Sequence, residues 1–383
     1  MLTTEGCRER QRRFLERLEG TLGAGAWDTV VIHKPEHLLY LANFYPLPNS
    51  LNFQSSNFLL LERTGAVTLF TDNWLDPGEL SAADEVITRD WYTCQCEAEN
   101  RALLVADAVR KRLEKLRTRK ACAELGHLPH QVASSVETWV EIEPILRTMR
   151  EIKDADELGA IRRCVRTAEA MHTASRGLLR PGMTELELYG QLLAHGVLAA
   201  GTPFVMMCDL ASGPRAAQGG GAPTSRKIQD GELVILDFFP YVEGYRGDIA
   251  NTLVAGGKPT QEQEDHFGLV HAALKAAEGL LQPGMPVSEV YRAMEGTIRD
   301  PRLYPGLGGK RKLGHHAGHA IGLCHPEAPE LVPKSDRVLA EGMVVTLEPG
   351  FYGAPTGGVR LEHNYLVTRS GPEQLSHHKL GLA

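Results

Sequence analysis

The 383-residue sequence lacks any apolar run that approaches the roughly 20 residues needed to cross a bilayer. Its first twenty residues also lack the apolar core of a secretory signal. Positive charge is scarce: 41 Lys and Arg against 48 Asp and Glu give a net charge of −7, which argues against nucleic-acid or anionic-membrane partners. Seven cysteines without framework spacing point to a reducing compartment. We therefore expect a cytoplasmic protein.

The composition is that of an ordinary globular protein, with 43% hydrophobic and 23% charged residues, and the length favours two domains. The N-terminal part alternates strand and helix patterns, which predicts an α/β domain over residues 1–148. The expected strands are 28–32, 58–61, 66–70, 85–87 and 121–125. The expected helices are 8–19, a helix ending near 44, 99–117 and 131–140.

From residue 149 onwards the pattern changes to long helices followed by alternating strands, which predicts an α+β domain over 149–383 with a mostly antiparallel, curved sheet. The expected helices are 154–179, 184–200, 261–281 and 286–299. The expected strands are 232–238, 246–254, 343–348 and 358–367.

Two aspartates stand at strand ends in this second domain. Asp237 ends the apolar run 233–236, and Asp248 follows after the sequence Glu-Gly-Tyr at 243–245, which predicts a turn. If the two strands pair, the turn returns Asp248 alongside Asp237 on one face of the sheet. A carboxylate that ends an apolar strand needs a partner, because burying an uncompensated charge is expensive. Two unrelated strand-end aspartates are the alternative.

Three histidines and two glutamates follow. The glycine-rich segment 314–323 contains His315, His316 and His319. Its glycines permit close backbone approach, which favours a metal-ligand or substrate-contact role for these histidines. A structural role is the alternative. Glu348 and Glu362 each follow a strand pattern. Arg360 shares a strand face with Glu362, so a plain ion pair is the alternative explanation for that glutamate.

Together these residues form the donor set expected for two adjacent divalent cations: Asp237, Asp248, His319, Glu348 and Glu362. Oxygen-rich ligation suits hard or borderline ions, and the single imidazole favours Mn, Fe, Co or Zn over Ca or Mg. The sequence therefore predicts a site for two divalent metal ions, with Mn as the first choice and Fe, Co or Zn as alternatives.

Four segments carry a family resemblance: GELVILDFFPYVEGYRGDIANT, GHAIGL, VVTLEPGFY and GGVRLEHNYLVT. They resemble the metal-site blocks of the creatinase/aminopeptidase P/prolidase family of metallopeptidases, which share the pita-bread fold. The resemblance covers residues 150–370 and, loosely, the N-terminal domain. It implies a pita-bread catalytic domain, an Xaa-Pro aminopeptidase or dipeptidase activity on small peptides, and a homodimer.

Carried over residue by residue, the resemblance implies that Asp237 chelates one metal and that His319 and Glu348 hold the other. Asp248 and Glu362 would bridge the two. A hydroxide between the cations would then attack the amide, since bound metals lower the pKa of their water.

The resemblance also implies roles beyond metal binding. Glu348 would pass the water's proton towards the leaving amine. His315 matches a substrate-orienting position and is expected to act in binding and catalysis. Arg360 and Tyr245 are further candidates for substrate binding, and His325 is a further catalytic candidate.

The sequence departs from the family pattern around the ligands. Gly220 stands where family peptidases have a proton-shuttling or oxyanion-stabilising histidine. A second family histidine falls on Pro326, so a one-residue deletion would let His325 fill its role. Phe239 lies in a pair of phenylalanines where the family prefers small residues. Because the ligands are intact, we infer retained metals with altered chemistry or specificity.

These departures leave other functions open. A non-peptidase enzyme on the same scaffold would act on a small nitrogenous metabolite, as an amidohydrolase, a lyase or a di-iron redox enzyme. A binding module with an empty metal site is the third possibility. The leading hypothesis remains a metal-dependent hydrolase of an amide C–N bond.

Overall fold

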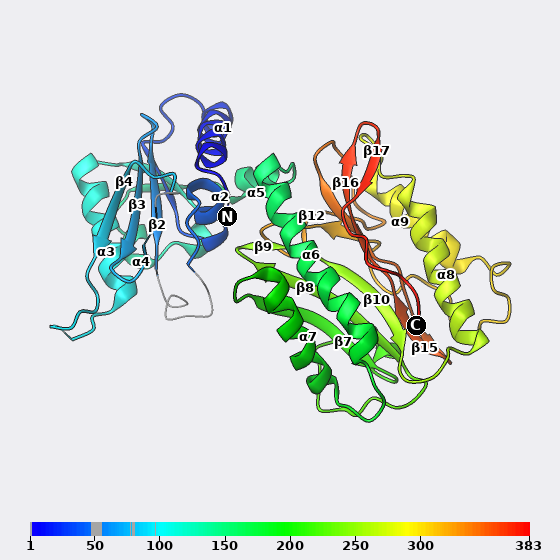
Figure 1. Cartoon of the computed structure of the whole chain (residues 1–383). Coiled ribbons are helices and arrows are strands. Elements are labelled where there is room, and N and C mark those ends of the chain that lie inside the picture. Colours follow the sequence, from blue (N-terminus) through cyan, green and yellow to red (C-terminus); the bar gives the residue numbers. More distant parts are fainter. Residues whose placement is uncertain (1, 47–55, 77, 79–80, 96) are drawn as a thin grey trace. The chain divides into compact units, whose positions relative to one another are not determined.

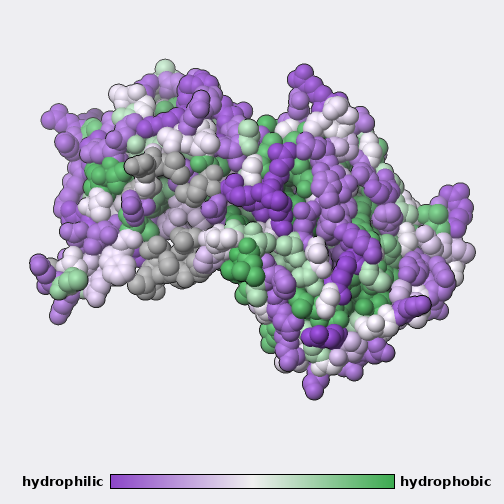
Figure 2. All heavy atoms as spheres, viewed as in Figure 1, coloured by the Kyte–Doolittle hydropathy of each residue, from purple (hydrophilic) through white to green (hydrophobic). Residues whose placement is uncertain are grey.

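The computed structural model describes residues 2–46, 56–76, 78, 81–95 and 97–383. The chain divides into two compact units, Met1–Arg150 and Glu151–Ala383 (Figure 1). Hydrophilic side chains predominate on the face shown in Figure 2, with hydrophobic side chains between them in smaller areas. Among the described helices, none has both the length and the apolar character required to cross a bilayer.

The first unit is built on a mixed sheet with the strand order β4-β3-β2-β1-β5-β6. Its strands are β1 (Thr29–Ile32), β2 (Phe58–Glu62), β3 (Val67–Asp72), β4 (Glu85–Arg89), β5 (Lys120–Ala123) and β6 (Thr138–Glu141). Its helices are α1 (Thr4–Leu22), α2 (Pro35–Ala42), α3 (Arg101–Leu116), α4 (His130–Ala133) and α5 (Glu143–Arg150), with a 3₁₀ turn at Leu125–His127. The α/β class and the antiparallel pairing of β2 with β3 are confirmed.

One predicted helix of this unit, over 131–140, is wrong. Helix α4 ends at Ala133, and after Ser134 and Ser135 the chain continues into strand β6. Ser favours turns over helix interiors, whereas the Thr-Trp-Val sequence that follows favours a strand. Pairing with β5 in parallel then fixes β6 at the edge of the sheet.

The second unit contains two antiparallel sheets and a separate hairpin. The first sheet, in the order β10-β8-β7, comprises β7 (Val205–Ser212), β8 (Leu233–Val242) and β10 (Ile249–Val254), with β9 (Tyr245–Arg246) attached to β8. The second, in the order β12-β11-β13-β16-β17, comprises β11 (His319–Ala320), β12 (Glu327–Glu330), β13 (Val344–Leu347), β16 (His363–Thr368) and β17 (Gly371–Gln374). The hairpin joins β14 (Gly350–Ala354) to β15 (Gly357–Arg360).

Four long helices accompany these sheets, as predicted: α6 (Ala155–Leu178), α7 (Glu185–Ala200), α8 (Gln261–Glu278) and α9 (Val287–Arg299). A 3₁₀ turn lies at Ala216–Gln218. Capping boxes begin α6, α7 and α8, which satisfies backbone N–H groups that a helix start leaves without partners. The α+β class of this unit is confirmed.

The single strand predicted over 358–367 is wrong, because it is two strands in different sheets. Between β15 and β16, the Leu361 backbone N–H donates to Pro349 O and the Glu362 N–H donates to Ala250 O. The chain therefore crosses from the hairpin to the second sheet at Glu362, while it is hydrogen-bonded to a strand of the first sheet. This crossing places Glu362 where the elements of the unit converge.

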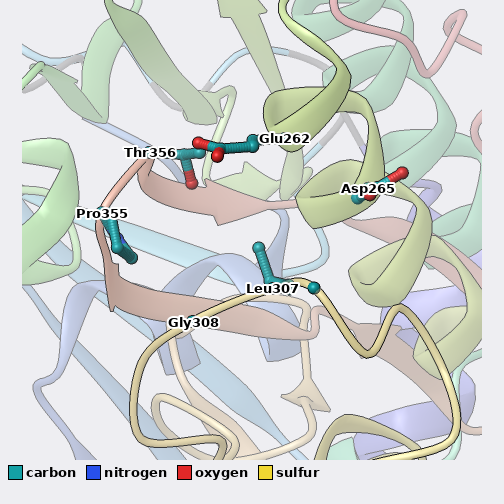
Figure 3. A pocket seen from close by; sticks show the side chains of 7 residues that line it. Glu262, Asp265, Leu307, Gly308, Pro355 and Thr356 are labelled. Atoms are coloured by element: carbon teal, nitrogen blue, oxygen red, sulfur yellow. The ribbon is translucent and has the colours of Figure 1, made fainter.

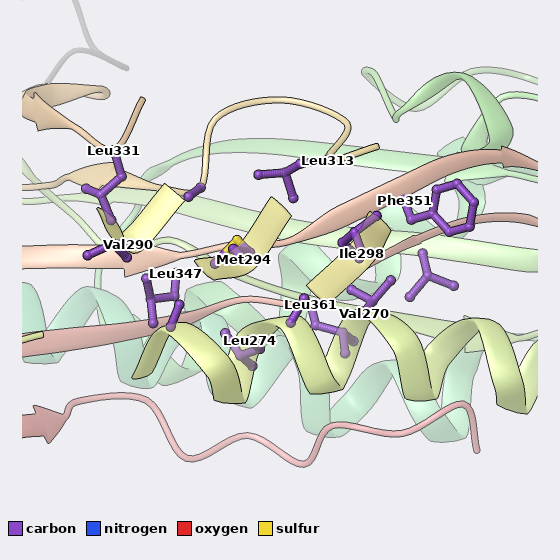
Figure 4. Packing of buried hydrophobic residues seen from close by; sticks show 14 of the residues in the cluster. Val270, Leu274, Val290, Met294, Ile298, Leu313, Leu331, Leu347, Phe351 and Leu361 are labelled. Atoms are coloured by element: carbon purple, nitrogen blue, oxygen red, sulfur yellow. The ribbon is translucent and has the colours of Figure 1, made fainter. Parts of the chain in front are cut away.

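Two apolar cores fix which side of each sheet remains for function. Helices α6 and α7 pack on the first sheet through a cluster that includes Leu236 and Phe238. Helices α8 and α9 contribute Val270, Leu274, Val290, Met294 and Ile298 to a second cluster, together with Val345 and Leu347 of β13 (Figure 4). Because side chains alternate along a strand, Asp237 and Thr346 face away from these cores.

Candidate metal centre

Strand alternation and register bring the two aspartates to one face. In the pairing of β8 with β10, Phe238 lies opposite Ile249 and Asp237 lies opposite Ala250. Asp248 directly precedes β10, so by the same register it faces position 239, two residues along from Asp237 and on the same side. The predicted pairing of the two strands is confirmed.

The five residues predicted as metal ligands lie in one continuous cluster. Asp237, Asp248 and Glu362 are buried, and each places a carboxylate oxygen within 4.8 Å of the other two. The Nε2 atom of His319 lies 3.4 Å from Asp248 Oδ2 and 3.3 Å from Glu348 Oε1. His319 Nδ1 lies 2.9 Å from the Ala320 carbonyl oxygen, which turns Nε2 towards the carboxylates.

The cluster contains buried oxygens without hydrogen-bond partners among the described residues: both carboxylate oxygens of Glu362 and Oδ1 of Asp237. Burial and the neighbouring Asp248 carboxylate raise the pKa of each of these two acids well above its usual value. An orphaned buried carboxylate is costly unless a cation compensates it. Three carboxylates converging in this way, beside an imidazole and a fourth carboxylate, fit a pair of divalent cations.

The negative charge of the carboxylates next to His319 is compensated by neighbouring imidazoles. Burial disfavours the charge of Asp248, but hydrogen bonds from His319 and His325 outweigh burial and lower its pKa. Burial likewise opposes the charge of His319, yet Asp248 and Glu348 raise its pKa to about 9. The pKa of Glu348 is lowered because the nearby histidines, His319 first, outweigh its burial. Opposite charges within reach of one another therefore stabilise this part of the cluster.

His325 belongs to this cluster. Its Nε2 lies 2.7 Å from Asp248 Oδ2, and its ring meets that of His319 edge-on with centroids 4.7 Å apart. The ring of Phe239 stacks on His325 at 4.7 Å, with an angle of 7° between the planes. Phe239 and His325, at two of the positions where the sequence departs from the family pattern, thus pack against each other beside the predicted ligands.

Arg360 and Glu362, both among the described residues, form no ion pair. The Nη1 group of Arg360 instead donates to the Oδ2 atoms of Asp237 and Asp209, the latter at 2.9 Å. Its Nε donates to the hydroxyl of Tyr352 at 2.8 Å. Arg360 is therefore engaged by the protein through several donors, and the alternative explanation of Glu362 as its ion-pair partner does not hold.

His315 and His316 also lie next to Glu348. His315 Nε2 is 2.8 Å from the Tyr352 hydroxyl, and its Nδ1 is 2.8 Å from the His316 carbonyl oxygen. Burial lowers the pKa of His315 to about 4, so its ring is neutral near pH 7. His316 Nδ1 lies 3.4 Å from Glu348 Oε1. Both rings border the carboxylate that the sequence predicts as the proton acceptor.

Tyr245, the remaining candidate for substrate binding, contacts helix α6. Its side chain is buried, and its hydroxyl lies 3.0 Å from the carboxylate of Glu157 on α6. Two other residues entered the site without having been predicted, Asp209 and Tyr352. Tyr352 lies in a segment that resembles the family, but strand β7, which carries Asp209, was not predicted at all. The available signal for Asp209 was its position as the one acidic residue in the otherwise apolar run 205–211, which is typical of a functional residue on a strand.

A cavity of about 320 Å³ lies elsewhere in the second unit (Figure 3). It is lined by Glu262, Asp265, Gly306, Leu307, Gly308, Pro355 and Thr356. None of the predicted ligands or substrate-binding residues lines it, so we assign it no part in the metal centre.

Residues 159–369 match the model of metallopeptidase family M24. The uncharacterized peptidase YqhT of Bacillus subtilis is 30% identical over 249 residues, which cover 64% of this chain and 68% of that protein. An Xaa-Pro dipeptidase of Pyrococcus horikoshii is 28% identical over 243 residues, covering 63% and 67%. The solved structure of an Xaa-Pro dipeptidase from Bacillus anthracis aligns with a TM-score of 0.80 at 25% identity, over 97% of this chain and 99% of that one.

Proposed function

The chain belongs to metallopeptidase family M24, and from this premise we propose that it is a dinuclear metal-dependent hydrolase of small Xaa-Pro peptides. The observation that carries the proposal is the convergence of four buried carboxylates and His319, with oxygens of Asp237 and Glu362 left without hydrogen-bond partners. Buried carboxylates of this kind are stable only when they are protonated or when positive charge compensates them. The Xaa-Pro specificity is carried by the likeness to named dipeptidases.

The donor set would be shared between two cations. Asp237 would hold one, His319 and Glu348 would hold the other, and Asp248 and Glu362 would bridge them. When bound, two divalent cations supply an activated water and polarise the scissile carbonyl. We propose Mn as the resident ion, with Fe, Co or Zn as alternatives, because the donors are mostly oxygens with one imidazole.

Side chains around the donors would handle protons and position the substrate. Glu348 would accept the proton of the attacking water and pass it to the leaving amine. His315 is held neutral, which suits a ring that orients a substrate through hydrogen bonds rather than through charge. His325 is partly exposed beside Asp248, within reach of a substrate, and would supply the histidine function that position 326 lacks.

The test begins with protein purified without added metal and analysed for metal content, followed by reloading with Mn²⁺, Fe²⁺, Co²⁺ or Zn²⁺. We expect two ions per chain and metal-dependent release of proline from Xaa-Pro dipeptides, or of Xaa from longer Xaa-Pro peptides. Absence of turnover with every such peptide and every cation would refute the peptidase proposal. One ion per chain or fewer after reloading would refute the dinuclear site.

A second candidate function is a non-peptidase reaction on a small nitrogenous metabolite. Gly220 favours it, because no side chain at this position can shuttle protons or stabilise an oxyanion. Metal-loaded protein that cleaves small amides but no Xaa-Pro peptide would support this candidate. Iron-loaded protein that consumes dioxygen with a small substrate would support a redox enzyme instead.

We further propose that the protein acts in the cytoplasm as a homodimer. Light scattering after gel filtration would test the assembly, with an expected mass of twice the 42.0 kDa of one chain. Imaging of a tagged protein in cells would test the compartment.

A further inference from the structure

Asp209 is an additional carboxylate at the metal centre. It lies on β7 directly opposite Asp237 on β8 (Figure 1). Residues that face each other across an antiparallel pair project to the same side of the sheet. Arg360 Nη1 bonds both carboxylates at once. Asp209 is therefore part of the surface that the predicted ligands form, although it is not among them.

The two aspartates differ in their access to solvent. The side chain of Asp237 is 6% exposed, whereas that of Asp209 is 28% exposed. Among the described residues, Arg360 is the one side chain that bonds Asp209, and it does so through Oδ2. The second oxygen, Oδ1, remains to accept a hydrogen bond from a bound molecule. One guanidinium shared between two carboxylates also cannot neutralise both.

The loop beside Asp209 leaves room for this carboxylate. Gly219, Gly220 and Gly221 all have positive φ angles, which side-chain-bearing residues rarely adopt. A Cβ atom at Gly220 would lie 2.6 Å from Asp209 Oδ2. A side chain at position 220 and the carboxylate of Asp209 thus compete for one space. Arg360 Nη2 holds the Gly219 carbonyl oxygen, which keeps the loop next to the aspartate.

The Asp209 carboxylate, which occupies the space of a side chain at position 220, changes the hydrogen bonds that this part of the site can form. A histidine at position 220 could donate a hydrogen bond to a substrate oxygen, whereas an ionised carboxylate can only accept. We propose that Asp209 determines specificity by binding a cationic nitrogen in the side chain of the substrate's first residue, an ammonium or a guanidinium group. This inference rests on the proposed function and adds the charge of the substrate to it.

A purely structural role for Asp209 makes a different prediction. If the residue only oriented Arg360, its replacement would affect all substrates alike, through the shared contact with Asp237. In D209N the amide oxygen can still accept from Arg360, but the charge is lost. A binding role therefore predicts a higher KM for substrates with a cationic side chain and little change for substrates with an uncharged side chain of similar size.

The experiment compares wild type, D209N and D336N, each loaded with the same cation. Asp336 is exposed, so D336N removes an equal charge without touching the site. Lys-Pro and Met-Pro provide side chains of similar length with and without charge. Wild type should prefer Lys-Pro, and D209N should lower the Lys-Pro to Met-Pro ratio of kcat/KM roughly tenfold through KM. D336N should leave the ratio unchanged.

Equal losses for both dipeptides in D209N would overturn the inference, as would a wild-type preference for Glu-Pro over Lys-Pro, which needs no variant. A separate binding measurement distinguishes failure of the inference from failure of the proposed function. Calorimetry with n-butylammonium and butylguanidinium should detect binding to wild type and weaker binding to D209N, even if no Xaa-Pro peptide is cleaved. Equal binding of these cations to both proteins would overturn the inference.

Discussion

The two sides of the metal centre solve the problem of buried charge in opposite ways. Asp237 and Glu362 carry buried oxygens without hydrogen-bond partners, and burial among other carboxylates raises their pKa values. Asp248 and Glu348 instead face imidazoles, which lower their pKa values despite equal burial. We call the first pair the carboxylate side, and the second pair, together with His319, the imidazole side.

The difference indicates where the proposed cations would contribute most. The imidazole side contains its own positive charge, since the pKa of His319 is raised to about 9. The carboxylate side receives positive charge from Arg360, but this guanidinium is divided between Asp237 and Asp209 and does not bond Glu362. The proposed cations would thus compensate mainly the carboxylate side, whose buried oxygens without partners destabilise the metal-free fold.

Removing a ligand from each side should produce the largest effects. Both E362Q and H319Q should lower metal-dependent activity by more than about 100-fold, because loss of a metal's supporting partner alone costs 10–100-fold. The metal-free proteins should separate the two sides. E362Q should be more stable than wild type by roughly 1–3 kcal/mol, since an orphaned buried charge is removed. H319Q should be less stable by roughly 1–3 kcal/mol, since Asp248 and Glu348 lose the charge of His319 while Asp248 keeps its contact with His325. Urea denaturation after chelation measures both.

Glu264 provides the matched control, because it is exposed on α8 and E264Q removes the same charge as E362Q. E264Q should change neither activity nor stability beyond about 0.5 kcal/mol. Equal destabilisation of metal-free protein by E362Q and H319Q would remove the distinction between the two sides.

The sequence supplied most of this site because strand alternation and the family resemblance are both local signals. The family and both fold classes are confirmed, and the predicted pairing of the strands that carry Asp237 and Asp248 is observed. What the sequence could not supply depends on tertiary contacts. The break at Glu362 arises from hydrogen bonds to distant segments, and the stacking of Phe239 on His325 joins residues 86 positions apart. Asp209 was missed because an acidic residue obscured the strand pattern of β7.

Replacing His325 tests whether the imidazole side contains a catalytic group besides its ligands. If His325 moves a proton during the reaction, H325A should lower kcat by roughly 10²–10⁴-fold. The bound metal should stay at two ions per chain, because we assign His325 no ligand role. Metal analysis of the purified variant, alongside its kcat, separates the two roles. Loss of metal in parallel with activity would show that His325 acts through metal binding, as a ligand or as the partner of Asp248, and would contradict the proposed catalytic assignment.

The pH dependence of stability should expose the carboxylate side in metal-free protein. Folded-state pKa values above the unfolded ones mean that the folded protein binds more protons, so stability is present at low pH and is lost as pH rises through the raised values. Each such group contributes a fall of up to about 1.4 kcal/mol per pH unit. E362Q should have a shallower fall than wild type, and saturating Mn²⁺ should flatten it in wild type. Denaturation curves at several pH values above 5 provide the measurement, and a wild-type slope equal to that of E362Q would contradict the assignment.

The smallest expected effect concerns Phe239, which stacks on His325 beside the imidazole side. Aromatic stacking is worth roughly 0.5–1.5 kcal/mol beyond burial, so F239L, which keeps an apolar side chain, should lower kcat by a few-fold to about tenfold. Metal content should not change. Phe267 stacks on His271 in helix α8 at 6.0 Å and 13°, so F267L removes a similar pair outside the site and should leave kcat unchanged. In the H325A background F239L should have no further effect on kcat, because the ring that it positions is already absent. An undiminished effect there would mean that Phe239 acts on the ligands or the substrate directly. The imidazole side would then include Phe239 as well as Asp248, Glu348 and His319.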